Sequence, residues 1–166
     1  MTTLNVSKAF HKHTTIQAGT MRDLSYVASR LRQADRAEID CQLPGWSPLF
    51  LAAVHLQGLA WTASWKGNPE MAFGCAEQRK SLWTAWSWGS EECWRCSPSV
   101  VDFIKTVSMP SILETDATRV EARALDGNLF AEKFLWYLGA TRRCELPGYG
   151  INGETFVLYD WTRETA

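Results

Sequence analysis

Apolar and polar residues alternate in several short runs of this chain, and such alternation is typical of strands that bury one face. In "RVEARAL", Val120, Ala122 and Ala124 alternate with charged neighbours, and the run "EMAFGCAEQ" follows a similar pattern. Turn residues separate these runs, as in an antiparallel meander. Strands are therefore predicted at residues 14–18, 59–65, 70–78, 81–89, 119–125, 140–146 and 154–161.

Other stretches repeat their apolar residues at helical spacing. From Leu24 to Ala34 these residues fall on one face of a predicted helix, and Thr20 precedes it as a capping residue. The charged side chains along this stretch are expected to face water; they are Arg30, Arg32, Arg36 and Glu38.

Proline and serine mark the start of two further helices. Ser47 and Pro48 open "SPLFLAAVHLQG", which is apolar nearly all round and is therefore expected to be well buried. Ser97 and Pro98 open the next helix, which Pro110 is expected to end or kink. The predicted order is β-α-α-β-β-β-α-β-α-β-β, and the crossover through residues 82–124 implies one parallel strand pair.

Length and charge place the chain among ordinary globular proteins. Its 166 residues predict one domain at 14–166 after a flexible N-terminus at 1–13. A net charge of −1 gives no reason to expect a nucleic-acid partner, and no apolar run reaches the roughly 18 residues that cross a membrane. Five cysteines without framework spacing fit reduced thiols, so a cytoplasmic location is expected.

The end of the chain carries the most specific pattern. In "GNLFAEKFLWYLGATRRCELPGYGINGETFVLY", Asn128 caps a helix, Gly139 ends it and a hairpin follows. With the order of elements before it, this stretch resembles the GNAT (Gcn5-related N-acetyltransferase) fold over residues 14–161. The resemblance implies an α/β fold with a mixed, mostly antiparallel sheet, splayed central parallel strands and about four flanking helices.

The middle of the chain also resembles the GNAT-like proteins of tailed bacteriophages, including the short internal virion proteins of the T7-like group. There, too, residues like "WSWGSEECWRCS" precede a helix, and an "LGA" turn follows the next helix. This resemblance carries no catalytic motif of its own.

The GNAT resemblance implies a place for acetyl-CoA where the central strands part, with the pyrophosphate on the amides of the loop from Gly89 to Ser99. The family's pattern in this loop is Gln or Arg, two residues, Gly, one residue, and then Gly or Ala. This chain has only one glycine there, early in the loop, and Glu91 and Glu92 add negative charge. These departures predict CoA binding that is weak, unconventional or absent. The candidate cofactor-binding residues are Trp88, Gly89, Arg95, Ser97, Ser99 and Asn128.

The catalytic residues that the resemblance would supply are also altered. Many family members place a tyrosine four residues before the glycine that ends the last helix, and that position is Leu135 here. The weak catalytic candidates are Tyr137, for which core packing is the alternative, and the carboxylates Glu121 and Glu77, for which a solvated surface role is the alternative. Glu70 is a further carboxylate of the same kind.

Other chemistry finds little support in the sequence. Cys93 and Cys96 form a CxxC, but no second pair of ligands has the spacing of a zinc site, so no metal is expected. His55 lies within an apolar helix, which favours a structural histidine.

Two functions remain open. The first is a phage-encoded GNAT-like protein that binds a host protein or forms part of a virion, and the second is an active acetyl-CoA-dependent N-acetyltransferase. Tryptophan is enriched at binding hot spots. In the first case, the partner-binding candidates are the exposed members of a set of four tryptophans: Trp83, Trp86, Trp88 and Trp94.

Overall fold

The computed structural model describes residues 8–9 and 12–163. The predicted flexible segment 1–13 therefore falls mostly outside the described residues. Within it, Lys8 and Ala9 pair with Ile16 and Thr15 of the next strand.

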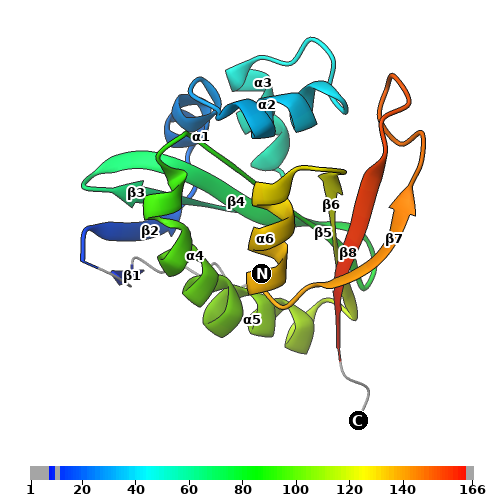
Figure 1. The fold of residues 1–166 in the computed structure, drawn as a ribbon. Helices are drawn as coiled ribbons and strands as arrows, with labels where there is room; N and C mark the ends of the chain where they lie inside the picture. Colours follow the sequence, from blue (N-terminus) through cyan, green and yellow to red (C-terminus); the bar gives the residue numbers. More distant parts are fainter. Residues whose placement is uncertain (1–7, 10–11, 164–166) are drawn as a thin grey trace.

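The sheet has the order β1-β2-β3-β4-β5-β6-β8-β7 (Figure 1). Every described neighbouring pair is antiparallel except β5 and β6, which are parallel. This arrangement confirms the predicted fold class. The strands are β1 (Lys8–Ala9), β2 (Thr14–Ala18), β3 (Leu59–Trp65), β4 (Asn68–Arg79), β5 (Leu82–Gly89), β6 (Arg119–Leu125), β7 (Thr141–Leu146) and β8 (Phe156–Thr162).

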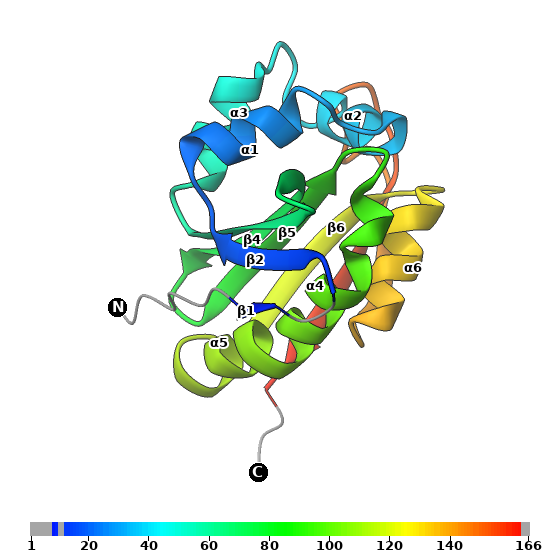
Figure 2. The ribbon, with the colours of Figure 1, turned by 90° about the vertical axis from the view of Figure 1, so that its left-hand side faces the viewer.

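The helices form two layers, with α1, α2 and α3 on one side of the sheet and α4, α5 and α6 on the other (Figures 1 and 2). A π-helical turn at Ile104–Ser108 joins α4 to α5 without a break in the chain's helical path. Pro110 follows this turn and lacks the N–H that a regular helix would use, so the predicted kink takes the form of a locally widened helix. The helices are α1 (Met21–Ala28), α2 (Gln33–Asp40), α3 (Pro48–His55), α4 (Ser97–Phe103), α5 (Met109–Thr115) and α6 (Leu129–Tyr137), with a short 3-10 turn at Cys93–Arg95.

Separate hydrophobic clusters fill the two faces of the sheet. On the α4 and α5 side, Phe73 of β4 packs against Trp61 and Phe103 with ring centroids 5.8 and 5.9 Å apart. On the α1 to α3 side, Leu24 and Trp88 are core residues. Trp83 and Ala85 of β5 pack against the first cluster and Trp86 and Trp88 against the second, so this strand alternates between the two faces, as its pleat requires.

The predicted helix from Leu24 to Ala34 is wrong in one respect, because the structure divides it into α1 and α2. Leu31 leaves the helical path to form an antiparallel β-bridge with Ser90. The amide of Arg32 then donates to the carbonyl oxygen of Gly89 at 2.9 Å. Pairing with the end of β5 therefore replaces one turn of helix, a tertiary effect that apolar spacing does not reveal.

The prediction that the helix at residues 47–58 is well buried is also wrong. Leu51 and Ala52 of α3 are fully buried, but Leu49 is 64% exposed and Phe50 is 50% exposed. The buried and exposed residues of α3 lie on different sides of the helix, so only one side meets the core.

Candidate functional site

The two central strands separate soon after they pair. Residues 82–84 of β5 pair with residues 119–121 of β6, and no pairing between these strands is recorded for the described residues beyond that point. This confirms the predicted splay. We call the resulting gap the notch, and a cavity of about 750 Å³ lies in it. Residues from both faces of the sheet line the cavity, among them Trp86 and Trp88 on one side and Phe134 and Trp161 on the other.

The α1–α2 segment occupies the β5 side of the notch at its open end. The amide of Gly89 donates to Oδ2 of Asp35 at 2.8 Å, and its carbonyl oxygen accepts from the amide of Arg32. Both main-chain groups of the last β5 residue are therefore bound by the chain itself.

A second carboxylate of α2 binds the end of β6. Oε2 of Glu38 accepts from the amide of Leu125 at 2.8 Å and from Nδ2 of Asn128 at 2.9 Å. Asp35 and Glu38 are three residues apart, so they lie on the same side of the helix. Their carboxylates connect the two strand ends through α2. We call these contacts the α2 bridge.

Burial raises the pKa values of both carboxylates in the α2 bridge. Nε of Arg32 lies 2.8 Å from Oδ1 of Asp35, and the guanidinium lies 4.9 Å from the ring centre of Phe130. Loss of solvent raises the pKa of Asp35, and the Arg32 charge opposes this effect only in part. Loss of solvent likewise raises the pKa of Glu38 above its usual range.

Several amides of the loop between β5 and α4 already have partners, most of them within the loop and one on β4. The amide of Ser90 donates to the carbonyl oxygen of Glu70, and the amide of Cys93 donates to that of Ser90. The amide of Glu92 donates to the Ser90 hydroxyl at 3.2 Å. Further along, the amides of Arg95 and Cys96 also donate to carbonyl oxygens of this loop.

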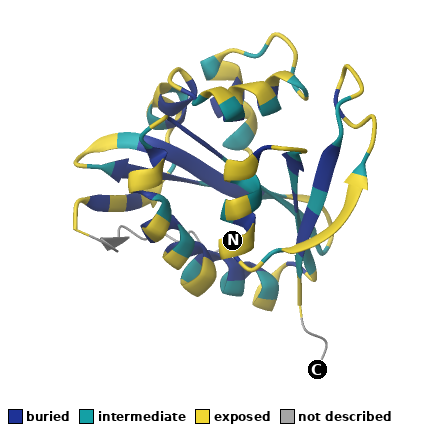
Figure 3. Cartoon of the chain, viewed as in Figure 1, coloured by how far each residue is buried: buried dark blue, intermediate teal, exposed yellow. Residues whose placement is uncertain are grey.

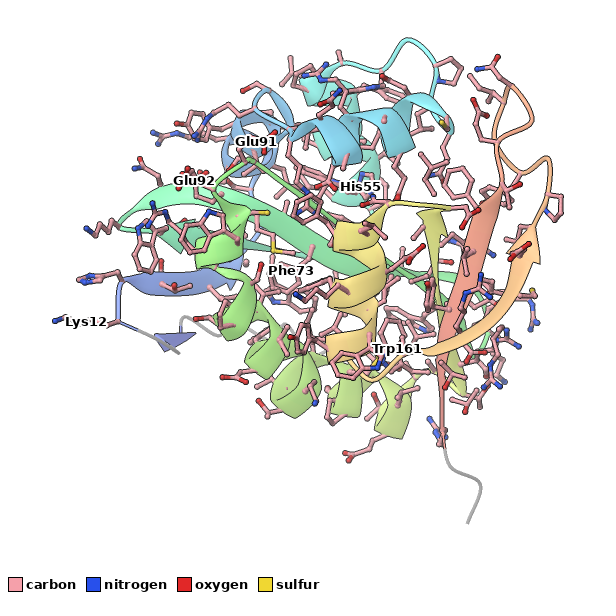
Figure 4. The ribbon with its side chains drawn as sticks, in the orientation of Figure 1. Lys12, His55, Phe73, Glu91, Glu92 and Trp161 are labelled. Carbon is pink, nitrogen blue, oxygen red and sulfur yellow. The ribbon has the colours of Figure 1, made fainter. Side chains whose placement is uncertain are left out.

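Two carboxylates lie on the same loop, at the end of α4 nearest the α1 to α3 layer (Figure 4). Oε1 of Glu91 accepts from the amide of Gln33 at 3.2 Å. Glu92 pairs with Arg95, whose guanidinium also lies 4.6 Å from the ring centre of Trp94. The loop therefore carries negative charge that is only partly balanced by Arg95.

The candidate cofactor residues do not form one group. Trp88 is only 3% exposed and belongs to the core under α1. The Ser97 hydroxyl donates to the carbonyl oxygen of Cys93, and Ser99 is fully buried. Asn128 caps α6, as predicted, by accepting from the amide of Ala131.

The catalytic candidates lie apart from one another. Tyr137 is 50% exposed on the outer side of α6, against Trp136, and it does not line the notch cavity. Glu77 is exposed near the end of β4. Glu121 is held between Arg119 and Arg123. Glu70 is buried and accepts from the hydroxyl of Ser90.

The residues that sequence reasoning missed belong to α2 and the segment before it. Arg30 and Arg36 face water as predicted, but the prediction is wrong for Arg32 and Glu38, which are partly buried at the notch. Asp35 was not singled out at all. The three-residue spacing of the two carboxylates is visible in the sequence. The two strand ends that they bind lie far away along the chain, so the sequence does not reveal them as partners.

His55 reaches the notch from α3 (Figure 4). Its Nδ1 lies 2.8 Å from the carbonyl oxygen of Leu51, which can only accept, so Nδ1 carries the proton. Its ring lies edge-on to Trp86 at 4.2 Å, and burial lowers the pKa of the imidazole. His55 is therefore a neutral ring whose Nε2 can accept a hydrogen bond.

The cysteine pair is buried and protonated. Burial raises the pKa of Cys93 to about 11 and that of Cys96 to about 12, which removes the thiolate that redox or metal chemistry needs. Within residues 8–9 and 12–163, no group of three His, Cys, Asp or Glu side chains is placed to hold a metal ion. The helices of this part of the chain are all too short or too polar to cross a bilayer.

The tryptophans differ in exposure. Trp94 is 60% exposed, whereas Trp83 and Trp86 are half-buried and Trp88 is core. Of the four partner-binding candidates, Trp94 alone presents most of its side chain to solvent.

No family sequence model and no curated protein sequence matches this chain. Solved structures do match its fold. The ribosomal-protein-S5-alanine acetyltransferase from Vibrio fischeri superposes with a TM-score of 0.64 at 16% identity, over 96% of this chain and 97% of that one. A GNAT-family acetyltransferase from Bacillus anthracis gives 0.64 at 10% identity, over 96% and 99%. The yncA protein from Salmonella typhimurium, solved with its cofactor acetyl-CoA, gives 0.63 at 10% identity, over 93% and 96%.

Proposed function

We propose that this chain uses the GNAT acetyltransferase fold to bind a protein partner and that it does not turn over acetyl-CoA efficiently. The observation that carries this proposal is the α2 bridge. The resemblance to the family implies that the pantetheine arm would bind the open edge of β5 like an added strand. In this chain, Arg32 and Asp35 already bind Gly89 at that edge.

The loop that would receive the pyrophosphate supports the same conclusion. Anion binding at the start of a helix needs free amides and a favourable charge. Here several amides bind within the loop, and Glu91 and Glu92 add negative charge. A like-charge contact at about 4 Å costs on the order of 1–4 kcal/mol, depending on solvation. The residues present therefore do not fit acetyl-CoA in the arrangement that the family resemblance implies.

The proposed partner is a host protein in the cytoplasm or another component of a virion, as the likeness to phage GNAT-like proteins suggests. Trp94 is the proposed aromatic anchor, because it is exposed and its ring contacts Arg95. Arginine and tryptophan are both enriched among the residues that dominate binding energies.

A thermal-shift titration of the purified protein with acetyl-CoA tests the proposal. A ligand at 100 times its dissociation constant stabilises a protein by about 2.7 kcal/mol, which is readily seen as a rise in Tm. We expect no rise at millimolar acetyl-CoA. A rise that grows with ligand concentration and is abolished by Arg95→Glu would contradict the proposal.

A second function, an acetyl-CoA-dependent N-acetyltransferase, is supported by the cavity in the notch. Its volume of about 750 Å³ lies within the range of small-molecule sites. His55 lines it and offers a neutral nitrogen that can accept a proton. The same titration separates the two functions, because only the enzyme requires acetyl-CoA to bind.

A further inference from the structure

Five charged side chains form a continuous chain of ion pairs across the last three strands of the sheet. Arg119 on β6 lies 3.1 Å from Glu121 and 3.0 Å from Asp160 on β8. Arg123 lies 2.8 Å from Glu121, and Arg143 on β7 lies 2.7 Å from Asp160. Three arginines and two carboxylates give a net charge of +1, and we call the group the arginine cluster.

Asp160 fixes the geometry of the arginine cluster. Its side chain is 1% exposed, and it stands directly opposite Glu121 in the β6–β8 register. Two carboxylates in that arrangement repel each other unless cations lie between and beside them. The buried carboxylate therefore orients Arg119 and Arg143, so the cluster is a preorganised surface and not a set of independent side chains.

The arginine side chains remain accessible even though they are held in place. They are 39%, 27% and 43% exposed for Arg119, Arg123 and Arg143 respectively. The core under α1, α2 and α3 takes its strand residues from β3, β4 and β5, so it does not include the strands of the arginine cluster. At the edge of the sheet, β7 is exposed along nearly its whole length (Figure 3). Arg123 also lines the notch cavity, so the cluster continues into the notch.

The guanidinium groups have donors to spare. Each carries five N–H donors in a planar fork, and the ion pairs of the cluster engage one or two nitrogens of each group. A planar fork matches a carboxylate in a bidentate pair, which is why arginine recurs where carboxylates are recognised.

We propose that the arginine cluster binds an acidic segment of a protein partner, whose carboxylates take up the spare guanidinium donors. This inference rests on the proposed function of the chain as a protein-binding module, and it names the chemistry of the partner. Charge complementarity selects the occupant, because the cluster is locally positive. A nucleic acid would extend over more of the surface, and the chain as a whole carries a charge of −1, which opposes a long polyanion.

Fluorescence anisotropy with the full chain tests the inference. The probe is a short fluorescein-labelled peptide of alternating glutamate and serine, and its matched control carries glutamine in place of glutamate. We expect the glutamate peptide to bind and the glutamine peptide not to bind, with affinity falling as salt is added. Arg123→Gln should weaken binding about tenfold, the size of one charge-assisted hydrogen bond.

Two variants keep the test informative. Arg123→Gln leaves both partners of the buried Asp160 in place, so folding should survive. Arg142→Gln is the control, because it makes the same charge change on β7 outside the arginine cluster. Arg142 pairs with Glu145 and stands opposite Tyr159, which belongs to the core on the α6 side. We expect that control to bind within about twofold of the unaltered chain.

Several outcomes would overturn the inference: no binding of the glutamate peptide, equal binding of the two peptides, equal losses in the two arginine variants, or tighter binding of a single-stranded DNA oligomer. Acetyl-CoA added to the same protein gives a separate result. Saturable acetyl-CoA binding would contradict the proposed function. The peptide measurement would still decide, independently of that result, whether the arginine cluster binds an acidic segment.

Discussion

The two ends of the notch are held by different kinds of contact. At the closed end, β5 and β6 pair through their main chains at residues 82–84 and 119–121. At the open end, side chains of α2 hold Gly89 and Leu125 apart and in place. Main-chain pairing follows from the fold and tolerates many sequences, whereas the α2 bridge depends on particular residues. Function can therefore change at the open end while the fold stays the same.

The largest expected effect concerns the buried core on the α4 and α5 side of the sheet. Phe73→Ala removes a side chain that is 2% exposed and packs on Trp61 and Phe103, so it should lower the free energy of unfolding by about 3–5 kcal/mol. Phe130→Ala is the matched change at the open end, where the ring is exposed beside Arg32. It should cost about 0.5–1 kcal/mol, the strength of an exposed cation–π contact. Urea denaturation measures both, and equal losses would show that the two regions do not differ.

A smaller effect is expected from the α2 bridge itself. Glu38→Ala leaves the amide of Leu125 and the side chain of Asn128 without their carboxylate partner. Leaving partly buried donors unpaired should cost about 1–3 kcal/mol. Glu114→Ala, an exposed glutamate on α5, is the control and should change stability by less than about 0.5 kcal/mol. No difference between the two variants would mean that the bridge carries no stability.

The pH dependence of stability should report on the same carboxylates. Burial raises the pKa of Asp35 and Glu38 in the folded chain above their unfolded values of about 4. A raised folded pKa means that the folded state binds more protons in this window, so the contribution to stability is full below the unfolded pKa and is lost as the pH rises through the folded pKa. The sign is opposite to that of an ordinary salt-bridged carboxylate.

An Asp35→Asn and Glu38→Gln double variant isolates this contribution, because neither replacement titrates. The free energy of unfolding of the unaltered chain, measured relative to the variant by urea denaturation, should increase as the pH falls from 7 toward 4. A decrease over that range would show that the pKa values of these carboxylates are lowered on folding and that the bridge acts as a strong ion pair.

Local patterns were enough to predict strands β2 to β8, the caps and the final hairpin, but not the two-residue strand β1. Thr20 and Asn128 cap their helices through side-chain bonds three residues along, and alternation located β6. These features depend on neighbours in sequence. The break between α1 and α2 was not predictable in this way, because Leu31 pairs with Ser90, which lies far along the chain.

The candidate site was predictable only in outline. The resemblance to the GNAT fold implies the splay and the role of the loop after Gly89, and the negative charge of Glu91 and Glu92 is visible in the sequence. The α2 bridge could not be predicted, because Asp35 and Glu38 look like ordinary surface carboxylates of an amphipathic helix. The arginine cluster was missed for a related reason, because its centre, Asp160, lies in a strand that reads as apolar.

The most direct test of the central claim follows the two strand ends during a titration with acetyl-CoA. In a ¹H–¹⁵N spectrum, the amides of Gly89 and Leu125 report on their bonds to Asp35 and Glu38. If α2 closes the notch, both signals should stay in place, and their exchange with solvent should remain slow, at millimolar acetyl-CoA. A saturable shift of these two signals would show that acetyl-CoA binds in the notch. The proposal that the α2 bridge occupies the cofactor's place would then be wrong.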